Sequence, residues 1–328
     1  MTGIVKHETM SIAWVFPGQG SQAIGMGHDI YEHFSVARAI FDQADDLLNL
    51  PLRSLCFEGP EADLIATENT QPALLTVSTA LVRVLEDLGG AGLARPLAVA
   101  GHSLGEYSAL VAGGALDFPT ALRLVRRRGE LMAEAHEGSM AAVIGLAQEI
   151  LEEICLDINA APQGDASAAH STVVVANYNA PDQLVISGST LAVERASLQA
   201  KERGAKRVLP LKVSAAFHSP LMIYAAESMA HELERADVRD LDVPLIANVT
   251  AQELRGADEV RREAVAQVVA PVRWIASVQA MVAMGCTTFV EIGSGKVLTG
   301  LIRRIAPQVR TVTISTAADV RAFVAENS

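Results

Sequence analysis

The chain has 328 residues, a length that favours one large domain carrying an insertion, or two domains, over a single small core. Half of the residues are hydrophobic and 20% are charged, a composition that excludes a disordered chain, and no apolar run is long enough for a membrane-spanning helix. The net charge of −12 argues against broad nucleic-acid binding, which requires a positive field.

The N-terminus and the cysteines indicate the compartment. Residues 1–10 are polar and mixed in charge, without the apolar segment of a secretion signal. The three cysteines, Cys56, Cys155 and Cys286, have neither metal-ligand spacing nor the even number of a disulfide framework. A reducing cytoplasm is therefore the expected compartment.

In chain order, the first predicted element is a short buried strand at 14–16 that runs into a glycine-rich turn. A helix is predicted over 71–88, because its apolar residues recur at helical spacing and two glycines follow it. A second buried strand at 97–100 leads directly into the glycine-containing segment 101–105 and another helix. Strands that alternate with helices, with glycines at the turns, predict a mostly parallel sheet covered on both faces.

The middle of the chain has a different pattern. Strands are expected at 141–146, 173–176, 184–187 and 206–210, with a helix at 190–204 and a surface loop rich in Ala, Ser and Gly at 159–171. We therefore predict a small α+β subdomain over 139–207, inserted into a large α/β domain formed by 1–138 and 208–328. Strands predicted at 244–248 and 288–292 resume the alternation of strand and helix.

The most specific motif is Gly101-His102-Ser103-Leu104-Gly105, a G-x-S-x-G between a predicted strand and a predicted helix. The two glycines let the backbone turn tightly enough to hold the Ser103 hydroxyl at the carboxyl edge of the sheet. The helix N-terminus and free backbone N–H groups there can stabilise an oxyanion. An ordinary glycine-rich turn is the alternative, but the strand-turn-helix context favours Ser103 as a nucleophile in acyl chemistry.

A serine nucleophile needs a base to take its proton. Of the eight histidines, His102 adjoins the serine in sequence, so its side chain is expected to pack elsewhere. His218 lies in a loop of small residues after an apolar strand, and loops at sheet ends often carry chemistry. His218 is therefore the preferred candidate, against the alternative of a structural histidine.

Two other glycine-rich turns match nucleotide or phosphate motifs only in part. Residues 18–23 fit G-x-G-x-x-A after a strand, but the acids at the required distance fall within a predicted helix at 37–50. Residues 293–296 resemble the end of a phosphate loop, but valine stands at both outer positions of that motif. The first turn is expected to face the Ser103 pocket, and the second to cap a helix.

Arg126-Arg127-Arg128 is a basic run on a helix predicted to begin near Thr120. Successive residues of a helix point about 100° apart, so at most one of the three can enter a pocket. An inward arginine can bind a carboxylate through two parallel hydrogen bonds. The charge pattern leaves open which arginine points inward, and a solvated face is the alternative.

Together and in this order, these motifs resemble the malonyl-CoA:acyl carrier protein transacylases. The resemblance runs from about residue 12 to residue 305, and it includes further motifs at 70–75, 177–179, 217–219 and 291–298. It implies an α/β-hydrolase-like large domain with a mostly parallel sheet, and a small ferredoxin-like subdomain inserted in it. The change of pattern over 139–207 agrees with that arrangement.

The resemblance also implies roles for single residues. Ser103 would attack the thioester carbonyl of malonyl-CoA, and His218 would take the serine proton. The backbone N–H groups of Gln19 and Leu104 would form the oxyanion hole. Arg128, the arginine that precedes a glycine, would hold the malonyl carboxylate.

Three more residues receive roles from the same resemblance. Gln71 would line the pocket. A main-chain carbonyl orients the histidine in this family, and the matching position falls at 271–274, so the backbone of Arg273 is the expected orienting group. Phe217 would favour malonyl over methylmalonyl, as in related polyketide acyltransferases, although one pocket residue discriminates a methyl group by only about 1–3 kcal/mol.

The implied reaction is a ping-pong exchange of one thioester for another, without a bound metal or other cofactor. The malonyl group passes from CoA to Ser103 and then to the phosphopantetheine thiol of acyl carrier protein, to supply fatty acid synthesis. The enzyme is expected to be a cytoplasmic monomer with no membrane or nucleic-acid partner. An acidic carrier protein would need a local basic face, for which the candidates are Lys201, Arg203, Lys206, Arg207, Arg303 and Arg304.

Other interpretations stay open. A serine esterase or thioesterase would use the same nucleophile, but it usually places its histidine near the C-terminus after an acid and needs no pocket arginine. A malonyl transferase of a polyketide pathway or a malonate decarboxylase system would share the chemistry. A non-enzymatic nucleotide-binding or scaffold protein would not need Ser103, His218 and Arg128 together.

Overall fold

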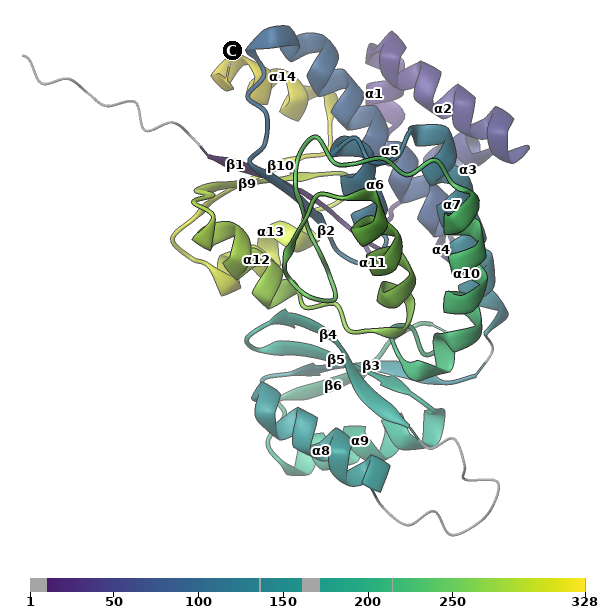
Figure 1. The fold of residues 1–328 in the computed structure, drawn as a ribbon, viewed down its shortest axis with the longest axis vertical. Helices are drawn as coiled ribbons and strands as arrows, with labels where there is room; N and C mark the ends of the chain where they lie inside the picture. The colour runs from purple at the N-terminus through teal and green to yellow at the C-terminus, as the bar shows by residue number, and fades with distance from the viewer. Residues whose placement is uncertain (1–10, 136, 161–171, 214, 328) are drawn as a thin grey trace, which may run out of the picture.

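The computed structural model describes residues 11–135, 137–160, 172–213 and 215–327. The segment predicted to lack a secretion signal, 1–10, and most of the loop predicted at 159–171 lie outside the described residues. Figure 1 shows a larger body around one sheet and a smaller body around a second sheet. None of the helices in the described ranges combines the length and apolar character that a bilayer crossing requires.

The larger sheet has six strands in the order β10-β9-β1-β2-β7-β8. Their bounds are β1 (Ile12–Phe16), β2 (Ala98–Gly101), β7 (Leu245–Ile246), β8 (Glu253–Leu254), β9 (Thr288–Ile292) and β10 (Arg310–Ile314). Neighbouring strands are parallel, except for β7 with β8. The prediction of a mostly parallel sheet is confirmed.

The strands of this sheet separate two apolar cores. Side chains alternate along a strand, so Trp14 and Phe16 of β1 join one core while Ala13 and Val15 join the other. The helices that contribute buried residues to the first core are α1 (His28–His33), α2 (Ser35–Leu48), α3 (Leu52–Glu58), α4 (Glu61–Ile65), α5 (Thr67–Gly89), α6 (Gly105–Ala112), α7 (Phe118–Glu134), α10 (Ile223–Arg235), α11 (Ala257–Val269) and α14 (Ala317–Asn327). The second core is closed by α12 (Trp274–Ala283) and α13 (Val297–Ile305). Both faces of the sheet are therefore covered.

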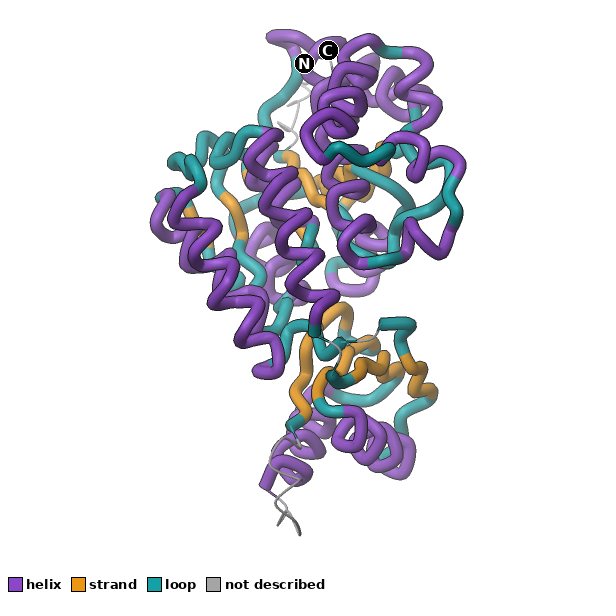
Figure 2. The backbone as a smooth tube through the Cα atoms, turned by 90° about the vertical axis from the view of Figure 1, so that its right-hand side faces the viewer, coloured by secondary structure: helices purple, strands orange, loops and turns teal. Residues whose placement is uncertain are grey.

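The smaller sheet is antiparallel, with the order β4-β5-β3-β6. Its elements follow one another as β3 (Ser139–Ile144), α8 (Gln148–Ala160), β4 (Val173–Ala180), β5 (Gln183–Gly188), α9 (Thr190–Glu202) and β6 (Arg207–Pro210). This β-α-β-β-α-β order and strand arrangement are those of a ferredoxin-like unit. Figure 2 shows the small sheet set apart from the helices of the larger body, with α8 and α9 on its outer side.

Two backbone hydrogen bonds join the small sheet to the larger body. The Tyr178 N–H of β4 donates to the Val272 carbonyl at 2.9 Å, and the Val272 N–H donates to the Ala176 carbonyl at 2.9 Å. Val272 lies between α11 and α12 of the larger body. The two bodies are thus in contact close to the end of α11, which carries part of the site described next.

Candidate active site

Ser103 sits on a sharp turn between β2 and α6. Its φ of 51° is in the left-handed region that L-residues rarely adopt. A Cβ on Gly101 would lie 1.9 Å from the Gly105 carbonyl carbon, and a Cβ on Gly105 would lie 2.1 Å from the Phe16 carbonyl oxygen. Only glycine fits at both positions, so the motif forms the tight strand-to-helix turn that sequence analysis predicts.

His218 contacts the Ser103 hydroxyl. Ser103 Oγ and His218 Nε2 are 2.7 Å apart, and His218 Nδ1 is 2.8 Å from the Gln267 carbonyl oxygen. His218 Nδ1–H therefore donates to the Gln267 carbonyl, which leaves Nε2 as the acceptor toward the serine. His218 also has a positive φ, 56°, and is buried. The histidine is thus fixed on both sides in the arrangement of a general base.

The expectation that the backbone of Arg273 orients His218 is wrong. The Arg273 N–H donates to the Asn248 carbonyl, and its guanidinium lies over the ring of Tyr178 in the small sheet. The carbonyl that faces His218 belongs to Gln267, in the last turn of α11. A helix carbonyl at this position normally accepts from the N–H four residues later, but residue 271 is a proline and has no N–H to donate. Pro271 was the sequence signal that could have identified Gln267.

Burial and the positive charge of Arg128 lower the pKa of His218 to about 3. A histidine whose pKa is lowered in the folded protein stays neutral until the pH falls through that lowered value. We therefore expect the rate constant of enzyme acylation, measured by rapid-quench mass spectrometry, to fall by less than about twofold between pH 8 and pH 5. A decline with a midpoint near 6.5, the usual pKa of a histidine, would contradict this expectation. Circular dichroism at each pH serves as the control for folding.

The turns around the serine carry two backbone N–H groups, those of Gln19 and Leu104, that are unpaired within the described part of the chain. A Cβ on Gly18 would lie 2.3 Å from the His102 carbonyl oxygen, so the turn after β1 is packed against the turn that carries Ser103. Among the described residues, the N–H groups of Gln19 and Leu104 have no hydrogen-bond partner. The Ser103 N–H, by contrast, donates to Asn248 Oδ1 at 2.7 Å. The pair predicted as an oxyanion hole is therefore available to a ligand.

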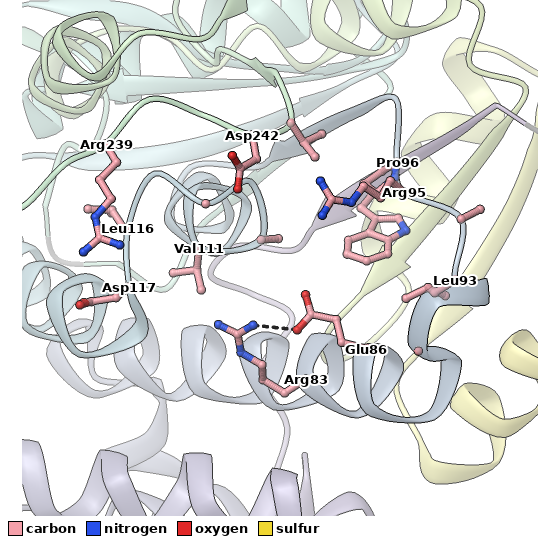
Figure 3. A pocket seen from close by; sticks show the side chains of 16 residues that line it. Arg83, Glu86, Leu93, Arg95, Pro96, Val111, Leu116, Asp117, Arg239 and Asp242 are labelled. Atoms are coloured by element: carbon pink, nitrogen blue, oxygen red, sulfur yellow. Dashed lines mark hydrogen bonds and ion pairs between the residues drawn. The ribbon is translucent and has the colours of Figure 1, made fainter.

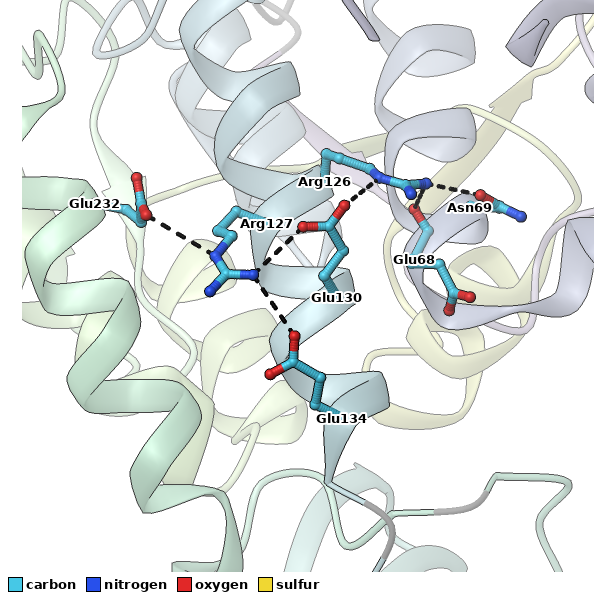
Figure 4. A network of polar contacts seen from close by, with 7 residues as sticks. All are labelled: Glu68, Asn69, Arg126, Arg127, Glu130, Glu134 and Glu232. Carbon is cyan, nitrogen blue, oxygen red and sulfur yellow. Dashed lines mark hydrogen bonds and ion pairs between the residues drawn. The ribbon is translucent and has the colours of Figure 1, made fainter. Parts of the chain in front are cut away.

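The three consecutive arginines of α7 face different surroundings. Arg126 binds Glu130, Asn69 and the Glu68 backbone at the surface, and Arg127 pairs with carboxylates of α7 and α10, as Figure 4 shows. Arg128 is 1% exposed and points inward. Its Nη2 lies 3.2 Å from Ser103 Oγ, which answers the question that the charge pattern left open.

The buried Arg128 guanidinium is held by neutral oxygens. Nη1 donates to Gln71 Oε1 at 2.8 Å, and Nη2 donates to Gln267 Oε1 at 2.9 Å. No carboxylate of the described residues lies within ion-pair distance of it, and its Nε has no partner among them. Burial lowers the pKa of Arg128. A buried charge with no carboxylate in direct contact is unfavourable, so this site is suited to receive an anion next to the serine.

The remaining predicted pocket residues are also buried. Gln71 is 1% exposed and contacts Met132 as well as Arg128. Phe217 packs in the first core immediately before His218 in the chain. His102 points away from the serine, with Nε2 2.7 Å from Asn179 Oδ1 and its ring edge-on to Trp274.

A separate cavity of about 540 Å³ lies near the amino ends of β1 and β2. Figure 3 shows Arg83, Arg95 and Arg239 around it, accompanied by Glu86, Asp117 and Asp242. None of the residues at the serine site lines this cavity. Three basic and three acidic side chains line it, so their formal charges balance.

Comparison with known proteins identifies the class. The family model described as an acyl transferase domain matches residues 13–320. The malonyl CoA-acyl carrier protein transacylase of Bacillus subtilis is 46% identical over 307 residues, which cover 93% of each chain. The crystal structure of an acyl-carrier-protein-S-malonyltransferase from Bartonella henselae is 43% identical, with a TM-score of 0.90 over 97% of this chain and 99% of that one. A type II PKS acyl-carrier protein in complex with its malonyl-transacylase matches at 40% identity and a TM-score of 0.90, over 97% of this chain and all of that chain.

The serine turn, the sheet and these matches place the chain in the acyl transferase family, to which it belongs. The resemblance to the malonyl-CoA:acyl carrier protein transacylases, predicted from the motifs, is confirmed by relatives matched over nearly the full length. The predicted α/β fold class is confirmed with it.

Proposed function

We propose that this chain transfers the malonyl group of malonyl-CoA to the phosphopantetheine thiol of acyl carrier protein through an ester on Ser103. The observation that carries the proposal is the buried Arg128, which lacks a carboxylate partner among the described residues and lies 3.2 Å from Ser103 Oγ. A neutral ester or a long neutral acyl chain would leave this charge uncompensated, whereas the malonyl carboxylate would pair with it through two hydrogen bonds.

In the first half-reaction, Ser103 Oγ attacks the thioester carbonyl while His218 Nε2 takes the hydroxyl proton. The carbonyl oxygen becomes an oxyanion, to which the N–H groups of Gln19 and Leu104 donate. The C–S bond then breaks, His218 returns the proton to the CoA thiolate, and malonyl-Ser103 remains. In the second half-reaction, His218 takes the proton of the carrier thiol, and the thiol sulfur attacks the ester carbonyl. The bond from the carbonyl to Ser103 Oγ then breaks, and His218 gives the proton to Oγ.

The setting we propose is fatty acid synthesis in the cytoplasm, by a monomer that needs no cofactor beyond its thioester substrates. The three cysteines are free and buried, which supports a reducing compartment. A polyketide pathway would use the same chemistry with another carrier protein, as the matched complex illustrates. The fatty acid and polyketide settings are distinguished by comparing the rates of malonyl transfer to the carrier protein of each pathway.

The function is tested by the intact mass of the protein after brief incubation with malonyl-CoA or acetyl-CoA. A malonyl adduct that forms readily, with little adduct from acetyl-CoA, supports the proposal. Steady release of free CoA without an adduct would indicate a thioesterase. Neither adduct nor CoA release would contradict the proposal and leave a binding protein.

We further propose that the carrier protein docks on the basic segment at β6. Two of the other candidate cations are already paired: Arg203 pairs with Glu153, and Arg304 pairs with Asp182. Lys206 and Arg207 are exposed and have no ion pair among the described residues. They lie at the start of the strand that leads back toward His218.

Charge reversal at this segment, Lys206→Glu with Arg207→Glu, is expected to raise the KM for acyl carrier protein about tenfold, because it replaces attraction by repulsion for an acidic partner. The rate of acylation by malonyl-CoA should not change. Steady-state transfer at varied carrier concentration measures the effect, and Arg321→Glu on α14 is the control. An unchanged KM would remove this segment as the docking site.

A further inference from the structure

One buried carboxylate supports both halves of the site. Glu106, in the first turn of α6, is 1% exposed. Its Oε2 accepts a hydrogen bond from the Asn248 backbone N–H at 2.8 Å, and its Oε1 accepts one from Gln267 Nε2 at 2.9 Å. Glu106 does not touch the Ser103 hydroxyl or the Arg128 guanidinium, but each of its partners contacts one of those residues.

The first partner, Asn248, holds the turn that carries the nucleophile. Its Oδ1 accepts from the Ser103 N–H at 2.7 Å, and its Nδ2 donates to the Gly101 carbonyl at 2.6 Å. The Asn248 side chain therefore fixes the backbone on both sides of His102. Glu106 in turn fixes the Asn248 backbone.

The second partner, Gln267, connects the base and the arginine. Its backbone carbonyl faces His218 Nδ1, and its side-chain Oε1 accepts from Arg128 Nη2 at 2.9 Å. Its Nε2 donates to Glu106 and also to the Ser103 carbonyl at 3.0 Å. An amide group can turn its oxygen to either side, whereas each Glu106 oxygen faces an N–H donor and acts as an acceptor. Glu106 and the Ser103 carbonyl together hold the Gln267 NH₂ inward, so that its oxygen faces Arg128.

We infer that Glu106 is a positioning residue for recognition of the acyl carboxylate, acting through the amide orientation of Gln267. With Oε1 toward Arg128, the guanidinium is held by two amide oxygens, from Gln71 and Gln267, that direct it at Ser103. The inference rests on the proposed function, because it assigns Glu106 to the selection of malonyl over neutral acyl groups.

The variant Glu106→Gln tests this with little change in volume. The Asn248 donor belongs to the backbone and cannot turn, so the oxygen of the new amide faces it and the new NH₂ faces Gln267. Two NH₂ groups then face one another, and this clash is relieved when the Gln267 amide turns. Gln267 thereby gives up its bond to the Ser103 carbonyl, and Arg128 loses an acceptor and meets a donor instead. Loss of a hydrogen bond to a charged group corresponds to about a 10- to 100-fold effect, so we expect the ratio of kcat/KM for malonyl-CoA to that for acetyl-CoA to fall by that factor.

Glu263→Gln is the matched control. Glu263 is also buried, at 7% exposure, and its Oε1 accepts from the Val249 N–H at 2.8 Å, but among the described residues its carboxyl group makes no hydrogen bond to the side chain of Gln267 or Arg128. Both variants replace a buried carboxyl group next to the same loop by an amide. Only Glu106→Gln is expected to change the malonyl-to-acetyl ratio.

A conservative variant separates positioning from a structural role. Glu106→Asp keeps an acceptor-only carboxylate, so it should hold the ratio within about threefold of the wild type even if the overall rate falls. If Glu106→Gln does not fold, Glu106→Asp is compared with Gln267→Met. The Gln267→Met variant keeps the carbonyl that faces His218 but loses the side-chain amide. The malonyl-to-acetyl ratio should fall only in Gln267→Met. An equal fall in both kcat/KM values, or an unchanged ratio, would overturn the inference. A wild-type protein that forms no malonyl adduct would count against the proposed function instead.

Discussion

Replacement of Ser103 by alanine is expected to abolish the covalent intermediate and to lower the malonyl transfer rate by about a thousandfold or more. The reason is geometric, because the hydroxyl that His218 Nε2 can deprotonate is that of Ser103, at 2.7 Å. Without this hydroxyl no malonyl ester forms on the enzyme, so the carrier thiol would have to attack malonyl-CoA directly. Intact mass after rapid quench reports the intermediate, and a coupled assay of free CoA reports the rate.

Ser108→Ala is the appropriate control for this variant. Ser108 lies on α6 one turn after the motif, and its Oγ is buried without a hydrogen-bond partner among the described residues. Its replacement should leave the adduct and the rate close to those of the wild type. A malonyl adduct that persists in Ser103→Ala, on another residue, would contradict the assignment of the nucleophile.

Replacement of Arg128 by alanine should change which acyl group the enzyme accepts. Truncation of one partner of a buried charge pair costs about 2–5 kcal/mol, so we expect kcat/KM for malonyl-CoA to fall by a factor between about 30 and a few thousand. The value for acetyl-CoA should change little or rise, because the acetyl group has no carboxylate and no longer shares its pocket with an uncompensated charge. Acylation rates with both thioesters measure the ratio.

Arg127→Ala provides the comparison within the same helix. Arg127 is half-exposed and paired with Glu130, Glu134 and Glu232 at the surface (Figure 4). It should retain the wild-type preference for malonyl-CoA. A parallel loss with both thioesters in Arg128→Ala would mean that the arginine stabilises the fold and does not read the carboxylate.

Local pattern predicted much of the fold and the nucleophile turn. The strands at 14–16 and 97–100 are short buried runs, and the helix at 71–88 shows clear periodicity, so all three appear close to their predicted positions as β1, β2 and α5. The G-x-S-x-G turn needs only local information, because its two glycines and the flanking elements lie within a few residues of Ser103.

Arg128 shows where a local signal was present but not used. Buried residues of α7 stand three and four positions before it, at Val125 and Leu124, and again after it at Leu131 and Met132. The arginine therefore occupies the apolar stripe of the helix, whereas Arg126 and Arg127 do not. Helical periodicity could have selected it without reference to a family.

Contacts between distant segments could not be predicted in the same way. Gln267 and Asn248 lie about 160 and 145 residues after the motif whose backbone they hold. They meet it because β7 and α11 close the carboxyl edge of the sheet, and no local pattern in either segment specifies that contact. The assignment of Arg273 failed because it rested on a match by position; Pro271 marks the Gln267 carbonyl as free, but the contact of that carbonyl with His218 joins distant segments.

The distance between Arg128 and Ser103 also limits the length of the acyl group. The guanidinium is buried, is fixed by two amides and lies 3.2 Å from the attacking oxygen, so it cannot withdraw to make room. The free carboxylate of a diacid ester can therefore pair with Arg128 only if a few bonds separate it from the ester carbonyl. The pocket therefore selects the number of carbons between the ester carbonyl and the carboxylate, because each added methylene would move the carboxylate beyond the Arg128 guanidinium.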